Sequence, residues 1–320
     1  MTLPLMDLRA WTDGTDARRR AFAAEVDDAL QTSGFLLLSG HGIPVGWRAE
    51  LREAAARAFA LPDDVRARYA TQVGGRGWIP PGKEANSFYG EESDPDRADM
   101  KESWVTGPAV GTGDPAVDAE WFPPNVWPDE VPELEACALR YTTALDHLYA
   151  ELIRVCASAL GLEPDWFVDR TRRGVRSLNI NRYPALREVG PALDGQFRIA
   201  PHTDWGTLTI LDRQPGYGGL QLQAPNGEWQ DAPFVDDAFT INVGDLLARW
   251  TGDRWRSTRH RVLPPPVDVP DEALTSLIAF FEADPDVLVE PFGPPIGRHD
   301  DYEPVLAGDW LLSRYAATRV

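Results

Sequence analysis

The stretch that decides the fold is Ala200-Pro201-His202-Thr203-Asp204-Trp205-Gly206-Thr207-Leu208-Thr209-Ile210-Leu211. Residues i and i+2 of a β-strand point to the same face, so His202 and Asp204 are expected to lie together. After Gly206 the alternation of threonines with Leu208 and Ile210 is typical of a half-buried strand. The stretch therefore predicts a strand, a turn and a second strand, with two metal-binding side chains at the turn.

A third candidate ligand, His260, lies 56 residues after Asp204 in Ser257-Thr258-Arg259-His260-Arg261-Val262. Two imidazoles and one carboxylate on one face of Fe(II) leave positions open for O2 and a bidentate organic co-substrate. We therefore predict that His202, Asp204 and His260 are the metal ligands and the catalytic centre of an oxygenase. The other histidines of the five in the chain lie in a turn, a helical pattern and a polar loop, where a structural role is expected.

Composition narrows the class of protein. The chain has 50 acidic residues against 31 Lys and Arg, a net charge of −19, which argues against a nucleic-acid partner. No run approaches the roughly 18 apolar residues of a membrane span, and the first residues lack a signal-peptide pattern. Cys137 and Cys156 are too few for a disulfide framework. We expect a cytoplasmic protein, monomeric or homodimeric, whose partner is a small-molecule substrate rather than a nucleic acid or a membrane.

Hydrophobic periodicity predicts helices first and strands afterwards. Helical patterns cover residues 16–32, 46–60, 132–160 and 305–318, and short strands are expected at 3–8 and 35–38. Further strands are expected at 177–183, 219–223, 238–243 and 276–281 and in the two histidine segments. This order favours a mostly β fold with flanking helices around a double-stranded β-helix, or jelly-roll, core.

The chain is expected to have two regions within one compact unit. Residues 1–125 would form a helical and strand region, in which the Gly- and Pro-rich stretch 73–125 serves as a long active-site loop. Residues 126–320 would form the jelly-roll oxygenase core with a long supporting helix and a C-terminal helix.

Several motifs in order resemble the isopenicillin N synthase-like family of non-haem Fe(II), 2-oxoglutarate-dependent oxygenases. They are Phe35 to Pro44, Arg76-Gly77-Trp78-Ile79-Pro80, Asn181-Arg182-Tyr183-Pro184, Asn242 to Leu247 and Ser257 to Val262. The resemblance covers nearly the whole chain, and the order of the motifs is far more specific than any one of them.

The resemblance implies that His202, Asp204 and His260 bind Fe(II), and that Asn181 and Tyr183 donate hydrogen bonds to a carboxylate of co-substrate or substrate. The implied co-substrates are 2-oxoglutarate and O2, with ascorbate as a further candidate. A ferryl-oxo species would abstract hydrogen from a small metabolite, as in natural-product biosynthesis, and give hydroxylation, desaturation or cyclisation. Because Asp204 is present, halogenation is disfavoured.

The chain departs from the family at the anchor for the distal carboxylate of 2-oxoglutarate, where relatives carry Arg-x-Ser. Alignment on Phe280-Phe281 places Thr275-Ser276-Leu277 there, without the arginine. A buried carboxylate without a cation is costly. We expect Thr275 and Ser276 to bind the co-substrate through their hydroxyls, helped by an arginine from a neighbouring segment. The candidates for that arginine are Arg182, Arg249, Arg254, Arg256 and Arg261.

Two alternatives stay open at the level of sequence. The missing arginine also fits an Fe(II) oxidase of the isopenicillin N synthase type that does not use 2-oxoglutarate, which succinate formation would distinguish. A catalytically silent jelly-roll binding protein would retain the metal for stability alone, and iron-dependent O2 uptake would exclude it. The candidates for an apolar substrate pocket are Trp205, Leu220, Leu222, Phe280 and Phe281, with Trp78 and Phe88 to close it, although ordinary core packing is favoured for each of them.

Overall fold

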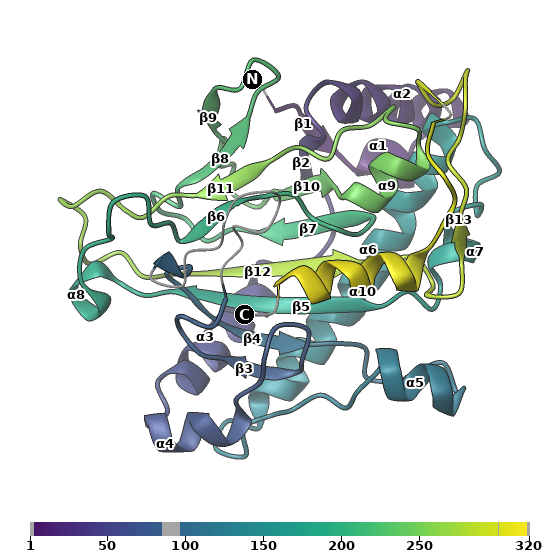
Figure 1. Ribbon diagram of the computed structural model, residues 1–320. Coiled ribbons are helices and arrows are strands. Elements are labelled where there is room, and N and C mark those ends of the chain that lie inside the picture. The colour runs from purple at the N-terminus through teal and green to yellow at the C-terminus, as the bar shows by residue number, and fades with distance from the viewer. Residues whose placement is uncertain (1–2, 85–96, 300, 319–320) are drawn as a thin grey trace.

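Two mainly antiparallel sheets carry most of the strands in the computed structural model, which describes residues 3–84, 97–299 and 301–318 (Figure 1). The larger sheet has the order β1 (Leu5–Asp7), β2 (Phe35–Ser39), β10 (Phe239–Val243), β7 (Leu208–Asp212), β12 (Leu274–Phe281), β5 (Arg176–Tyr183), β4 (Glu102–Thr106) and β3 (Gly77–Ile79). The smaller sheet has the order β6 (Ile199–His202), β11 (His260–Val262), β8 (Leu220–Gln223) and β9 (Trp229–Asp231). A separate pair joins β13 (Leu288–Val289) to β14 (Val305–Leu306).

Three long helices pack on one side of the larger sheet: α2 (Asp16–Thr32), α3 (Val45–Phe59) and α6 (Glu133–Ala159). The helix α6 buries a continuous stripe that includes Leu134, Leu145 and Leu152, the spacing of one helix face. The helix α10 (Ala307–Thr318) lies across β5 and β12 in the view of Figure 1. The shorter helices are α1 (Arg9–Thr12), α4 (Asp63–Arg66), η1 (Ala67–Tyr69), α5 (Pro115–Trp121), α7 (Val168–Thr171), α8 (Leu186–Val189) and α9 (Asp245–Trp250).

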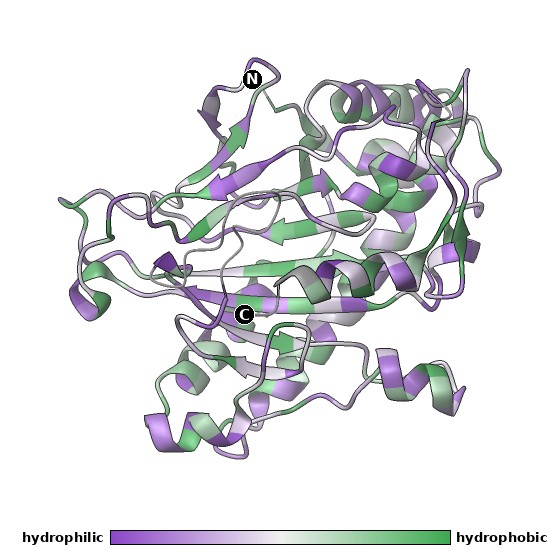
Figure 2. Ribbon diagram, in the orientation of Figure 1, coloured by the Kyte–Doolittle hydropathy of each residue, from purple (hydrophilic) through white to green (hydrophobic). Residues whose placement is uncertain are grey.

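The two faces of β12 show how the sheet separates core from site. Leu277, Ala279 and Phe281 belong to the main hydrophobic core with the long helices. The alternate residues Leu274, Ser276, Ile278 and Phe280 line a cavity between the two sheets. Figure 2 shows the hydrophobic residues concentrated on the central strands of the larger sheet. The strand period of two therefore places one set of side chains in the core and the other at the site.

The predicted fold class, a mostly β fold with flanking helices and a jelly-roll core, is confirmed. The predicted loop 73–125 is wrong in part, because its described residues contain β3, β4 and α5. The strands β3 and β4 are short; β4 pairs with β5, and β3 pairs with β4 at the edge of the sheet. Gly- and Pro-rich flanks hid them, since their stability comes from pairing with a distant strand.

Strands from the first 125 residues and strands from the rest share the larger sheet. The boundary between the two predicted regions at residue 125 stays a prediction. Among the residues that the structure describes, none of the helices combines the length and the apolar character needed to cross a membrane.

Candidate active site

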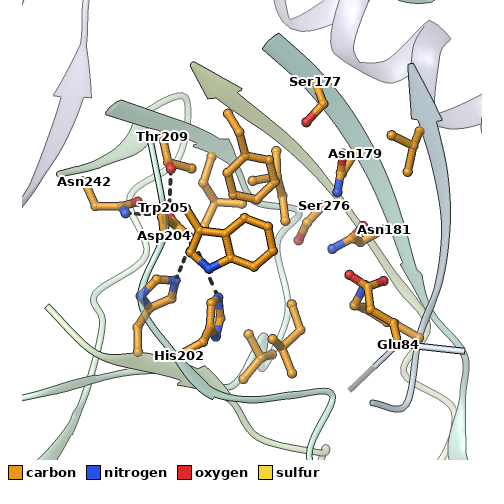
Figure 3. A pocket seen from close by; sticks show the side chains of 18 of the residues that line it. Glu84, Ser177, Asn179, Asn181, His202, Asp204, Trp205, Thr209, Asn242 and Ser276 are labelled. Atoms are coloured by element: carbon orange, nitrogen blue, oxygen red, sulfur yellow. Dashed lines mark hydrogen bonds and ion pairs between the residues drawn. The ribbon is translucent and has the colours of Figure 1, made fainter. Parts of the chain in front are cut away.

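The three predicted metal ligands come together in the smaller sheet, where β6 ends and β11 begins. His202 ends β6 and pairs directly with His260 at the start of β11, while Asp204 follows two residues after His202. The Asp204 Oδ1 atom lies 3.7 Å from the Nε2 atom of each histidine, and the three ligating atoms all lie within 4.8 Å of one another. Figure 3 shows this cluster at one wall of the cavity.

Hydrogen bonds orient each ligand toward a common point. The Nδ1 atoms of His202 and His260 lie 2.8 and 3.1 Å from the carbonyl oxygens of Ala200 and Thr258, which leaves both Nε2 atoms as acceptors. The Asp204 Oδ2 atom accepts hydrogen bonds of 2.6 Å from Thr209 Oγ1 and Asn242 Nδ2. Only Oδ1 of this carboxylate is therefore left facing the two imidazoles (Figure 3).

Electrostatics keep His202 and Asp204 in the forms that bind a cation. Burial and the neighbouring His260 lower the pKa of His202 to about 3, so its imidazole is neutral near pH 7. Burial alone would raise the pKa of Asp204, but the two histidines and the hydrogen bonds from Asn242 and Thr209 lower it. A neutral imidazole and an ionised carboxylate are the forms in which these groups bind metals.

The donor set fits Fe(II). Two imidazole nitrogens and one carboxylate oxygen converge from one side, and the opposite side opens into the cavity. Neither cysteine of the chain is near the cluster, so the thiolate donors that favour zinc and copper are missing from it. The residues present would hold the ion facially and leave its remaining positions to ligands from the cavity.

The structure brings Asn181, Tyr183 and Ser276 to the cavity and leaves Thr275 out of it. Ser276 pairs with Asn181 in the β12–β5 ladder, and Tyr183 lies two residues further along the same face. Thr275 points to the opposite face of β12, where its carbonyl oxygen accepts a hydrogen bond from Arg52 Nε. The alignment on Phe280-Phe281 was therefore shifted by one residue. If Ser276 is the serine of the Arg-x-Ser motif, the position of the arginine, two residues earlier, is occupied by Leu274.

The side-chain amide of Asn181 is oriented by a buried relay from β4. Lys101 Nζ donates to Ser103 Oγ at 3.1 Å, and Ser103 Oγ donates to Asn181 Oδ1 at 2.9 Å. Because its oxygen is occupied, Asn181 presents its Nδ2 donors to the cavity. Figure 3 shows Ser177, Asn179 and Asn181 in a row on β5, facing the same space.

None of the five arginines proposed from the sequence lines this cavity, as far as the described residues form it. Arg182 pairs with Glu102, Arg254 pairs with Asp27, and Arg261 donates to Gln221. Arg249 and Arg256 donate to the carbonyl oxygens of Glu303 and Gln31. All five are therefore committed to contacts elsewhere.

Three other cations do line the cavity: Arg76, Lys101 and Arg213. Sequence reasoning missed Arg213, although a signal existed. Thr209 and Leu211 share a strand face, and continuing the same alternation by two residues reaches Arg213. The cavity wall confirms this, since all three residues line it.

Only some of the candidate residues for an apolar pocket line the cavity. Trp205, Leu220 and Phe280 line the cavity, whereas Leu222, Phe281 and Trp78 are buried outside it. Phe88 lies outside the described residues. The helix α10 contributes Leu311 and Tyr315 to the wall, and the ring of Tyr315 meets Trp205 edge-on at 5.5 Å.

Comparison with known families decides the class of this site. Residues 176–276 match the model of the 2OG-Fe(II) oxygenase superfamily, and residues 3–130 match the N-terminal domain model described for the non-haem dioxygenase in morphine synthesis. The chain belongs to the 2OG-Fe(II) oxygenase superfamily. Its matched region contains the whole His202-Asp204-His260 cluster.

Individual relatives of this oxygenase agree. The chain is 38% identical to validamycin A dioxygenase of Streptomyces hygroscopicus subsp. limoneus, over 98% of this chain and 86% of that protein. It is 31% identical to the 2-oxoglutarate-dependent dioxygenase ecdK of Aspergillus rugulosus, over 83% and 82% of the two chains.

Solved structures give the same result. A full-length protein of Neurospora crassa, crystallised in complex with alpha-KG, superimposes with a TM-score of 0.83 at 28% identity, over 98% of this chain and 96% of that one. A 2OG-Fe(II) oxygenase family protein of Caulobacter crescentus matches with a TM-score of 0.83 at 26% identity, over 98% of both chains. The protein is thus an Fe(II)- and 2-oxoglutarate-dependent dioxygenase, and the silent binding protein is excluded as an alternative.

Proposed function

We propose that this dioxygenase oxidises a C–H bond of a small, polar metabolite, through metal ligands His202, Asp204 and His260. The observation that carries the proposal is the convergence of the three ligating atoms within 4.8 Å at the wall of a cavity. When bound there, Fe(II) with 2-oxoglutarate and O2 supplies the oxidising power for hydroxylation, desaturation or ring closure, while 2-oxoglutarate leaves as succinate and CO2.

The residues of the chain hold the reactants in place. Asn181 offers its amide donors to the co-substrate, because the Lys101–Ser103 relay fixes its amide. Ser276, its partner in the ladder, and Tyr183, two residues further along β5, offer hydroxyl groups to the same cavity. Such fixed donors position a reactant without reorganisation at the moment of reaction.

The polarity of the substrate follows from the wall beyond Asn181. Ser177 and Asn179 face the cavity from β5 (Figure 3), and the buried Asn179 Oδ1 atom has no hydrogen-bond partner among the described residues. A buried acceptor without a partner costs about 1–3 kcal/mol, so an N–H or O–H group of the substrate is expected to satisfy it. A relative whose name mentions validamycin A, and a structural neighbour crystallised with thymine, support a polar small molecule as the substrate class.

The test is coupled turnover with a panel of polar metabolites: aminocyclitols, pyrimidines and hydroxylated aromatics. We expect one class to raise succinate formation and to gain one oxygen, or lose two hydrogens, by mass spectrometry. The variant Asn179→Leu should keep the slow succinate formation expected without substrate and lose its stimulation by substrate. If only hydrophobic compounds are oxidised, the proposed substrate class is wrong. The cytoplasmic location, the monomeric or homodimeric state and the use of ascorbate remain predictions.

A further inference from the structure

The end of the cavity away from the metal ligands has the donors of a carboxylate site but lacks the usual cation on β12. Leu274 and Ser276 face this end, so the side chain two residues before Ser276 is apolar. Tyr183 lies opposite Leu274 in the ladder and is 3% exposed. A dicarboxylate held here would leave its distal charge desolvated, which requires a cation nearby.

Arg213 lies at this end of the cavity. The β7–β12 ladder pairs Asp212 with Leu277, and one further residue in the same register brings Arg213 beside Ser276. A Cβ atom added to Gly218 would lie 3.3 Å from the Arg213 Nη2 atom, so the guanidinium packs against the backbone of that glycine. Arg213, Ser276 and Tyr183 all line the same cavity.

The guanidinium of Arg213 is held in place but is not neutralised by the protein. Its Nη1 atom donates to the carbonyl oxygens of Pro233 at 2.9 Å and Ala232 at 3.3 Å. Burial lowers the pKa of Arg213, and the nearby Tyr183 opposes that effect, whereas no carboxylate of the described residues does so. A partly buried cation with free donors in a cavity is a functional-site feature.

The other two cations close to Tyr183 already have acidic partners. Arg198, 1% exposed, has its guanidinium carbon 5.4 Å from the Tyr183 ring centre and pairs with Glu272 at 2.9 Å. Lys101 pairs with Glu84 and donates to Ser103. Neither pair leaves a net charge for a ligand, whereas Arg213 does.

We propose that Arg213 is the counter-charge for the distal carboxylate of 2-oxoglutarate, which it holds with the hydroxyls of Tyr183 and Ser276. In relatives the cation comes from β12, whereas here it comes from the end of the neighbouring strand β7. Because the two strands are adjacent, the Arg213 side chain reaches the same end of the cavity. The inference rests on the proposed function, since it assigns one end of the same bound co-substrate. It also removes the reason for preferring an oxidase that does not use 2-oxoglutarate.

The test is an anaerobic titration of the Fe(II) protein with 2-oxo acids, followed by the visible charge-transfer band of the chelated keto acid. Arg213→Leu should weaken 2-oxoglutarate binding about 10- to 100-fold, because it removes a charge-assisted pair. It should leave the affinity for 2-oxopentanoate, which has the same chain length and no distal carboxylate, within about 2-fold. Arg213→Lys should lie between the two, since lysine keeps the charge without the planar fork.

A charge-return variant separates ligand binding from folding. Adding Leu274→Arg to Arg213→Leu puts the cation back on β12 and should restore most of the affinity for 2-oxoglutarate. Arg187→Leu removes an exposed arginine that pairs with Asp271 and serves as the matched control. As a second readout, 2-oxoglutarate should raise the thermal midpoint of the Zn(II)-loaded wild type more than that of Arg213→Leu.

The two proposals fail differently. A normal band in the wild type that Arg213→Leu leaves unchanged would overturn the assignment of Arg213 and leave the proposed function standing. If the double variant Lys101→Met/Glu84→Gln alone loses 2-oxoglutarate, Lys101 is the anchor instead. A wild type that binds Fe(II) and gives no band with any 2-oxo acid would overturn both proposals.

Discussion

The metal end and the carboxylate end of the cavity are built in different ways. At the metal end, three ligands converge from β6, β11 and the turn after β6, and every non-ligating polar atom among them has a protein partner. At the other end, Arg213 follows β7, Tyr183 comes from β5 and Ser276 from β12. The Arg213 guanidinium donates to backbone carbonyls and lies over the Phe234 ring, and no carboxylate of the described residues pairs with it. Metal coordination requires fixed directions, whereas a carboxylate requires only a cation within reach.

This difference explains why the cation at the carboxylate end can come from another strand, whereas the ligands at the metal end cannot. Moving a metal ligand by one residue would turn its side chain to the opposite face of the strand. Moving the cation from β12 to β7 keeps the charge in the same space, because the long arginine side chain can approach from either strand. The comparison predicts abrupt losses for changes at the metal end and graded ones at the carboxylate end.

The largest effect is expected for Asp204→Ala. Two imidazoles would remain, without the only anionic ligand, so we expect Fe(II) binding and succinate formation to fall to the level of the metal-free protein. Bound iron per chain and succinate from 2-oxoglutarate are the measurements. Asp236→Ala, which removes an exposed carboxylate that does not line the cavity, is the control. Appreciable Fe(II)-dependent turnover in Asp204→Ala would show that the metal end is as adaptable as the other.

A smaller loss is expected for Asn242→Ala. Asn242 Nδ2 and Thr209 Oγ1 share the Asp204 Oδ2 atom, so one hydrogen bond that aims Oδ1 would survive. Loss of such a partner typically costs about 10- to 100-fold in metal affinity. An anaerobic Fe(II) titration would measure it. Unchanged affinity would mean that the backbone alone orients the carboxylate.

The difference between the metal end and the carboxylate end also determined which site residues could be predicted from the sequence. The clustering of His202, Asp204 and His260 was predictable because metal chemistry fixes residue types, and the strand period fixes the spacing of the first two; their role as metal ligands stays a prediction. The offset at Thr275 arose because alignment on two aromatic residues tolerates a shift of one residue, which reverses the face of a strand. The alternation of Thr209 and Leu211 indicated the face on which Arg213 lies, but its place beside Ser276 could not be predicted, because the pairing of β7 with β12 is long-range.

A moderate loss of affinity for 2-oxoglutarate is expected for Ser103→Ala, which acts through Asn181. The substitution breaks the relay from Lys101 and frees Asn181 Oδ1. A net hydrogen bond of about 1 kcal/mol corresponds to roughly a 5-fold weaker affinity for 2-oxoglutarate, with Fe(II) affinity unchanged. The charge-transfer titration measures the first and the iron titration the second. An equal loss of the affinities for 2-oxoglutarate and Fe(II) would show that Ser103 also supports the metal ligands.

The smallest effect is expected for Arg76→Leu, on the thermal midpoint of the protein. Whether the midpoint rises or falls shows whether the fold needs this cation. Arg76 lines the cavity, is 8% exposed, and has neither a hydrogen-bond nor an ion-pair partner among the described residues. Its guanidinium packs closely against Gly107, where a Cβ atom would lie 2.3 Å from Nη2. Burial lowers the pKa of Arg76, as expected of a cation that the fold does not compensate.

Replacing an uncompensated buried charge by an apolar side chain is often neutral or stabilising, so Arg76→Leu should leave the thermal midpoint of the metal-free protein unchanged or raise it by about 2–4 °C. Arg213→Leu should instead lower the midpoint slightly, because the carbonyl oxygens of Ala232 and Pro233 lose a donor. A midpoint for Arg76→Leu several degrees below the wild type would show that the fold needs this cation. A rise would show that the protein retains Arg76 at a cost in stability, as binding sites commonly retain groups that serve a ligand.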